Sequence, residues 1–297
     1  MLLKHRTLLV MGLLGLLCAS SRVLAQKMYW ADAFSDKIQR ANLQLPAGQT
    51  PGNRTDVEDL VTAGLERPFA IAVDSVNGKL YWTDYVTHKI SRANLDGTGV
   101  EDVIATGLKL PGGIAVDSAG GKIYFVDAGT DKIQRANLDG TNPEELVVQG
   151  LSIPSSIVLD TTAGRMYWSD IGTDKIQRAE LSGANVVDIV STGLGAPTSL
   201  AIDPAGGKLY WSDTRPSSNS SVSHIARANL DGSQIEIVVT GVVGIRAGLA
   251  LDLVAAKMYW TDVQLKRITR ANLDGSSIED VLTIGLTAPQ GIAIDHK

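Results

Sequence analysis

The chain has 297 residues, 44% of them hydrophobic, and its 32 acidic and 27 basic side chains give a formal net charge of −5 at pH 7. An acidic chain without a run of basic residues is not expected to bind nucleic acid or an anionic membrane surface. Its single cysteine excludes an internal disulfide framework.

The first 25 residues have the pattern of a secretory signal peptide. A basic segment, Lys4 to Arg6, precedes an apolar run from Leu8 to Leu17, and Val23-Leu24-Ala25 resembles a cleavage site. The run has about ten residues, whereas a bilayer-spanning helix needs roughly 20. We therefore expect cleavage near Ala25 and an exported protein, extracellular or periplasmic, without a membrane span. Lipid attachment through Cys18 is an alternative, which the large residue before it disfavours.

One six-residue motif recurs along the rest of the chain. Its tyrosines are separated by 52, 43, 43, 43 and 49 residues, and all five tryptophans occupy the position after the tyrosine, with Phe125 in the remaining copy. Repetition at a fixed period of this size is typical of propellers, solenoids and arrays. The six copies are KMYWAD (27–32), KLYWTD (79–84), KIYFVD (122–127), RMYWSD (165–170), KLYWSD (208–213) and KMYWTD (257–262).

The second unit predicts a four-stranded antiparallel meander. Short β-rich segments are separated by tight turns with Asn-Gly or Asp-Gly signals. In the motif, Leu80, Tyr81 and Trp82 are consecutive large side chains, so both faces of the sheet need a cover. Radial packing of blades around an axis covers both faces, because each sheet then packs between two neighbouring blades. The predicted strands of this unit are 69–73, 79–83, 88–95 and 102–106.

The two ends of the repeat region complement each other. Residues 27–31 form a second strand with no first strand before it, and 290–295 form a first strand with no second strand after it. We therefore expect residues 26–297 to form one all-β domain, a six-bladed β-propeller of four-stranded antiparallel blades, whose ring is closed by the C-terminal strand joining the N-terminal blade.

The six YWxD copies, each followed by a stretch like KIxRANLDG, resemble the YWTD repeats, or class B repeats, of the low-density lipoprotein receptor family. The resemblance covers nearly all of the chain after Ala25. It implies a six-bladed propeller that serves extracellular proteins as a protein-binding module.

Charged residues that occur in every unit are interpreted as scaffold. A charge repeated six times does not mark one active site, and partly buried charges need partners. The two sets are the motif acids (Asp32, Asp84, Asp127, Asp170, Asp213, Asp262) and the third-strand arginines (Arg40, Arg92, Arg135, Arg178, Arg227, Arg270).

Function is expected where the repeats differ. Three aromatics lie outside the motif, Phe34, Phe69 and Tyr85, all on the face formed by the second-to-third and fourth-to-first connections. Exposed aromatics and arginine are typical anchors for a protein partner. The alternative is that Phe69 plugs the central channel and the other two pack locally. The complete candidate set for binding a protein, peptide or glycan, by an expected monomer, is Phe34, Arg67, Phe69, Tyr85, His88, Arg215, His224, Arg246 and Gln290.

Two insertions also break the repeat. They occupy 43–56 in the first unit and 214–224 in the fifth, and each contains a glycosylation sequon, at Asn53 and Asn219. Their Pro, Ser and Gly content predicts solvated loops.

The alternative function is a metal-dependent lactonase or esterase of the gluconolactonase propeller type. Such an enzyme holds a divalent ion on the axis, which requires several oxygen ligands. The residues expected at the axial entrance include no carboxylate and no histidine, so we predict no catalytic residue, metal site or cofactor. These residues are Phe69, Gly112, Ser155, Thr198, Ala247 and Gln290.

Overall fold

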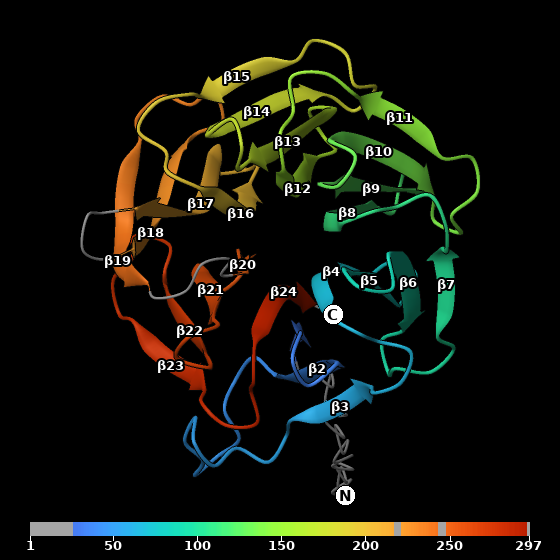
Figure 1. Ribbon diagram of the computed structural model, residues 1–297. Helices are drawn as coiled ribbons and strands as arrows, with labels where there is room; N and C mark the ends of the chain where they lie inside the picture. Colours follow the sequence, from blue (N-terminus) through green and yellow to red (C-terminus); the bar gives the residue numbers. More distant parts are fainter. Residues whose placement is uncertain (1–25, 217–220, 243–247, 296–297) are drawn as a thin grey trace, which may run out of the picture.

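The computed structural model describes residues 26–216, 221–242 and 248–295, and every regular element in these ranges is a β-strand. Six four-stranded antiparallel sheets stand as blades around a central axis (Figure 1), which confirms the predicted fold. No helix in the described ranges has the length and hydropathy of a membrane span. The predicted signal peptide, residues 1–25, lies outside the described residues.

The strands of each blade are given from the innermost, first strand to the outermost, fourth strand. Blade one contains β24 (Pro289–Asp295), β1 (Lys27–Asp32), β2 (Lys37–Asn42) and β3 (Glu58–Val61). Blade two contains β4 (Pro68–Asp74), β5 (Lys79–Asp84), β6 (Lys89–Asn94) and β7 (Glu101–Ile104). Blade three contains β8 (Pro111–Asp117), β9 (Lys122–Asp127), β10 (Lys132–Asn137) and β11 (Glu144–Val147). The strands predicted for the second unit agree with blade two to within two residues at each end.

The other three blades have the same order. Blade four contains β12 (Pro154–Asp160), β13 (Arg165–Asp170), β14 (Lys175–Glu180) and β15 (Val187–Val190). Blade five contains β16 (Pro197–Asp203), β17 (Lys208–Pro216), β18 (Ser221–Asn229) and β19 (Glu236–Val242). Blade six contains β20 (Leu249–Asp252), β21 (Lys257–Asp262), β22 (Arg267–Asn272) and β23 (Glu279–Leu282).

The ring closes through the pairing of the last strand with the first. β24 runs antiparallel to β1, with Trp30 opposite Ile292 and Lys27 opposite Asp295. In Figure 1 the red β24 lies between blade six and the blue strands of blade one. The predicted closure from both ends of the repeat region is therefore confirmed.

The motif aromatics fill the interfaces between blades. The tyrosine of each blade and the ring after the tyrosine in the next blade belong to the same buried apolar cluster, so every sheet is covered on both faces. Burial of such rings is the main favourable contribution to folding of an all-β ring without disulfides. The pairs are Tyr29 with Trp82, Tyr81 with Phe125, Tyr124 with Trp168, Tyr167 with Trp211, Tyr210 with Trp260 and Tyr259 with Trp30.

The repeated arginines also join neighbouring blades. Arg92, for example, donates from Nη1 to the carbonyl oxygen of Leu138 in blade three (2.8 Å) and from Nε to Glu101 in its own outer strand (2.7 Å). Around the ring, each third-strand arginine donates to a leucine carbonyl of the next blade, ending with Arg270 and Leu43 (3.4 Å). These contacts agree with the scaffold interpretation.

The motif aspartates organise the connections. Asp127 accepts hydrogen bonds from the backbone N–H groups of Lys109 and Leu110 before its blade and of Gly129 after its own strand. Asp32 does the same for Thr287 and Ala288 across the closure. A buried carboxylate is stable here because backbone donors replace the water it has lost.

The prediction of solvated loops holds for most of the blade one insertion, which has no strand and is largely exposed, but it was wrong for the described residues of the blade five insertion. In blade one, Arg54 is buried and Pro51 accepts a hydrogen bond from the backbone of Thr283, so the insertion lies over the outer edge of blade six. In blade five, the inserted residues extend β17 to Pro216 and start β18 at Ser221. Asn53 is exposed, whereas Asn219 lies outside the described residues.

Candidate functional site

The two ends of the blades form two faces of different character. We call the face that carries the second-to-third connections and the fourth-to-first connections the variable face. On the opposite face, glycine turns repeat from blade to blade. Gly140 shows why, because its φ is +82° and an added Cβ would lie 1.8 Å from the carbonyl oxygen of Val103 in the preceding blade. That face is therefore committed to packing between blades.

Four of the candidate residues form one contiguous group on the variable face, which we call the aromatic cluster: Phe34, Arg67, Phe69 and Tyr85. The guanidinium carbon of Arg67 lies 5.9 Å from the centre of the Phe34 ring. The rings of Phe69 and Tyr85 are stacked, with centroids 4.0 Å apart and planes inclined by 17°. The backbone N–H of Tyr85 donates to the carbonyl oxygen of Arg67 (3.1 Å), which joins the two pairs.

The aromatic cluster faces solvent. Phe34 is 68% exposed, Arg67 is exposed, and Phe69 and Tyr85 are half-buried. No carboxylate among the described residues forms an ion pair with Arg67, so its charge is available to a partner. A cation over a ring face and a half-buried ring pair are features of binding hot spots.

The backbone of Arg67 is in an unusual conformation. Its φ is +147°, a value that residues other than glycine rarely adopt. The following residue, Pro68, restricts the backbone of Arg67 further. Two hydrogen bonds hold it: Glu66 N–H donates to Asp84 (2.9 Å), and Arg67 accepts from Tyr85. Strain of this kind tends to occur at functional sites.

The other candidate residues are not brought into the aromatic cluster. His88 is exposed at the end of the Tyr85–His88 connection, and Gln290 lies at the entrance of β24. His224 is buried, with Nε2 3.7 Å from a carboxylate oxygen of Asp213. Arg215 belongs to β17, with its side chain outside the described residues, and Arg246 lies outside them altogether.

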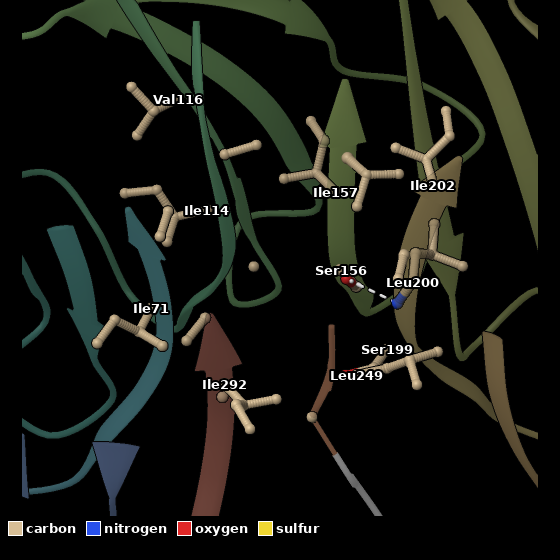
Figure 2. Close-up of a pocket in the computed structure, with 18 of the residues that line it drawn as sticks. Ile71, Ile114, Val116, Ser156, Ile157, Ser199, Leu200, Ile202, Leu249 and Ile292 are labelled. Atoms are coloured by element: carbon tan, nitrogen blue, oxygen red, sulfur yellow. Dashed lines mark hydrogen bonds between the residues drawn. The ribbon is translucent and has the colours of Figure 1, made fainter. Parts of the chain in front are cut away.

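The central axis contains an apolar cavity of about 400 Å³. Figure 2 shows its wall, where Ile71, Ile114, Ile157, Leu200 and Ile292 are among the aliphatic side chains. Among the described residues that line it, the polar side chains are two serines, and one of them, Ser156, accepts a hydrogen bond from the backbone of Leu200 (3.1 Å). No group of three His, Cys, Asp or Glu side chains in the described ranges is placed to hold a metal ion.

A smaller cavity lies at the entrance of the axis on the variable face. Phe69, Ser155, Thr198 and Gln290 line it, so four of the six residues expected there are present. Phe69 thus borders the channel and stacks on Tyr85 at once. The two interpretations of this side chain, channel plug and surface anchor, are compatible in the structure.

Comparison with known sequences decides the family. The sequence profile of the low-density lipoprotein receptor repeat class B matches residues 78–118, 121–161, 164–204 and 256–296, more than half of the chain. The chain belongs to the class B repeat family. The profile does not match the units of blades one and five, and these are the two class B repeats that carry insertions.

Individual relatives agree with this assignment. A segment of 71 residues, 24% of the chain, is 39% identical to mouse (Mus musculus) nidogen-2, but it spans only 4% of that protein. A chain in the crystal structure of a nidogen–laminin complex has a TM-score of 0.78 and 25% identity, over 91% of this chain and 98% of that one. A gluconolactonase from Xanthomonas campestris has a TM-score of 0.60 and 19% identity, over 74% and 77%, which shows a shared fold alone.

Proposed function

We propose that this class B repeat propeller is an exported, monomeric, non-enzymatic binding module that recognises a protein or peptide through the aromatic cluster. The observation that carries the proposal is the cluster itself. The chain has three aromatic rings outside the motif, and all three lie in the aromatic cluster. They lie next to an exposed arginine held in a strained backbone conformation. The motif aromatic rings are buried in the interfaces between blades.

The similarity to a chain from a nidogen–laminin complex supports a protein as the partner. The chemistry of the cluster specifies the partner further. An exposed arginine beside exposed and half-buried rings suits a segment that combines an acidic side chain, for Arg67, with an apolar or aromatic one, for the exposed Phe34 ring. The signal-peptide pattern supports export, where such a partner would be extracellular or periplasmic.

The aliphatic lining of the axial cavity supports the non-enzymatic part of the proposal. A lactonase of the gluconolactonase type would need oxygen ligands around the axis, and the described lining offers only aliphatic groups, two serines and backbone. A panel of lactones and esters assayed with added Ca²⁺, Mn²⁺ or Zn²⁺ should show no hydrolysis above buffer. Metal-dependent turnover would contradict the proposal.

The test of binding uses capture from the native extracellular fraction. The immobilised chain should retain a partner that the Phe34→Ala, Phe69→Ala, Tyr85→Ala triple variant does not retain. Phe34→Ala alone should already weaken capture, and because this ring is 68% exposed, the fold should be unaffected. Val254→Ala, equally exposed but on the opposite face, is the matched control. Equal capture by the triple variant and the parent would overturn the proposal.

A further inference from the structure

In blades one and four a chain of polar contacts runs from the motif tryptophan to the outer strand. In blade one, Trp30 donates from Nε1 to Gln39 (2.9 Å), Gln39 donates to Asp59 (2.6 Å), and Lys37 donates to the same carboxylate (2.7 Å). Blade four repeats the network with Trp168, Gln177, Asp188 and Lys175. Every buried donor in these two networks has its acceptor.

Blade five has lost this network by three substitutions at matching register positions. The position of Gln39 is taken by Ala226 opposite Trp211, and that of Asp59 by Ile237 opposite Ala226. The position of Lys37 is taken by His224 opposite Asp213. As a result, Nε1 of Trp211 is buried without a hydrogen-bond partner among the described residues. An unpaired buried donor is costly, so it calls for an acceptor from outside.

A cavity of about 200 Å³ lies on the rim between blades four and five, and we call it the rim pocket. Val190, Thr192 and Leu194 line it on the side of blade four. Trp211, His224, Ala226 and Ile237 line it on the side of blade five. Ile237 is 51% exposed, so the pocket opens to solvent beside an apolar lip. Trp211 is paired with Ala226 on the next strand, at the position whose glutamine accepts from the indole in blades one and four.

The corresponding place between blades two and three shows what the repeat normally presents there. A cavity of about 210 Å³ occupies the same position, but Gln134, Glu144 and Glu145 line it. The hollow is therefore a property of the architecture, whereas Ala226 and Ile237 replace a polar residue and an acid in blade five alone. Among the described residues, Trp211 is the motif tryptophan whose Nε1 is fully buried without a partner.

We propose that the rim pocket binds a small neutral molecule that consists of one apolar ring and one hydrogen-bond acceptor, which takes the N–H of Trp211. The size argues for a single ring, because an apolar cavity of about 150 Å³ is known to hold benzene. The lining is mostly apolar, with Thr192 and His224 as its polar side chains besides the indole, and it contains no carboxylate, lysine or arginine. This argues for a neutral ligand, because a charge there would lose its water without an ionic partner. The site lies on the rim, away from the aromatic cluster, and is independent of the function proposed for that cluster.

The test follows the indole N–H signals by ¹H–¹⁵N correlation NMR. The five tryptophans give five such signals, and Trp211→Phe assigns one of them, since Phe125 shows that the repeat accepts phenylalanine there. Acetophenone, a ring with a carbonyl acceptor, should shift the Trp211 signal downfield in a saturable way. Ethylbenzene has the same shape without the acceptor, so it should bind about five- to tenfold more weakly and leave that signal unshifted.

Variants that restore the repeat provide the control. Ala226→Gln places the usual acceptor beside the indole and occupies its N–H, so acetophenone should no longer shift the signal. Ile237→Asp restores the usual acid in the lip and should weaken binding as well, which keeps the test decisive if Ala226→Gln folds poorly. The proposal is overturned if acetophenone gives no saturable shift up to its solubility limit, or if it shifts the Ala226→Gln protein to the same extent.

Discussion

Arg54 donates a hydrogen bond from Nη1 to the carbonyl oxygen of Val281 (3.0 Å), 227 positions later in the chain. The same guanidinium binds both carboxylate oxygens of Asp56 (2.8 Å each) and the carbonyl oxygen of Asn42 (2.7 Å). The insertion of blade one is thereby attached to β23, the outer strand of blade six. The seam of the ring is held on the inside by β24 and on the outside by this arginine.

Replacing Arg54 by methionine should destabilise the protein strongly. The variant keeps the length of the side chain but leaves Asp56 and two backbone carbonyl groups without their donor. We expect a loss of about 2–4 kcal/mol in the free energy of unfolding, measured by urea denaturation followed by tryptophan fluorescence. Arg165→Met, at an exposed arginine, is the matched control and should change stability by less than about 0.5 kcal/mol. Equal effects of the two variants would show that the contacts of Arg54 do not stabilise the fold.

The pair with Arg54 also predicts a pH dependence. Burial alone would raise the pKa of Asp56, but the hydrogen bonds from Arg54 and from the backbone of Asn42 outweigh it and hold the pKa below its ordinary value of 3.8. The stabilisation is therefore complete above the unfolded-state pKa and is lost as the pH falls through the lower, folded-state pKa. Asp56→Asn should be less stable than the parent at pH 6, and the difference should shrink towards pH 2.5. A difference that is constant with pH would exclude this explanation.

The closure by β24 can be tested by truncation. Deleting 289–297 removes the innermost strand of blade one and uncovers Trp30 and Tyr29 on that side, so the cooperative unfolding transition should disappear. Deleting only 296–297 leaves β24 intact and should preserve the transition. Differential scanning calorimetry distinguishes the two. A long truncation that melts as sharply as the parent would contradict closure by strand pairing.

The contribution of the six third-strand arginines to the free energy of unfolding can be measured by comparing two of them. Arg92 binds Glu101 and the Leu138 carbonyl, whereas Arg178 faces Val187 instead of an acid and lies 3.5 Å from the Leu230 carbonyl. Lysine cannot make both contacts of Arg92. We expect Arg92→Lys to cost about 1–2 kcal/mol and Arg178→Lys less than about 0.5 kcal/mol in urea denaturation. The reverse order would show that the ion pair contributes nothing.

Much of the fold could be predicted because the six repeats can be aligned with one another, which shows the positions that they share and those that differ. The position of Tyr81 and Trp82 in every unit predicted two covered sheet faces, and the incomplete units at the ends predicted the seam. The aromatic cluster also followed from this pattern, since Phe34, Phe69 and Tyr85 are the rings that the repeat does not use. Their proximity to one another required coordinates, because two separate connections and the start of β4 bring them together.

The features that escaped prediction depend on contacts across blades. Nothing local to Arg54 indicates that its partner is Val281, and the surrounding Pro, Gly and Thr residues are typical of exposed loops. His224 was a binding candidate at the end of an insertion whose Pro, Ser and Gly content predicted a solvated loop, but it lies in β18 and is buried. The signal for the rim pocket was present in the repeat alignment, where Ala226 replaces a polar residue, but its meaning depends on the position of the Trp211 indole.

The most direct test of the account is hydrogen–deuterium exchange of the whole chain, alone and with its captured partner. Binding through the aromatic cluster predicts slower exchange in 33–36, 66–69 and 85–88, and unchanged exchange in the turns 75–78 and 253–256 on the opposite face. Protection confined to those turns, or to the rim of blades four and five, would contradict the claim that recognition takes place where blades one and two depart from the repeat.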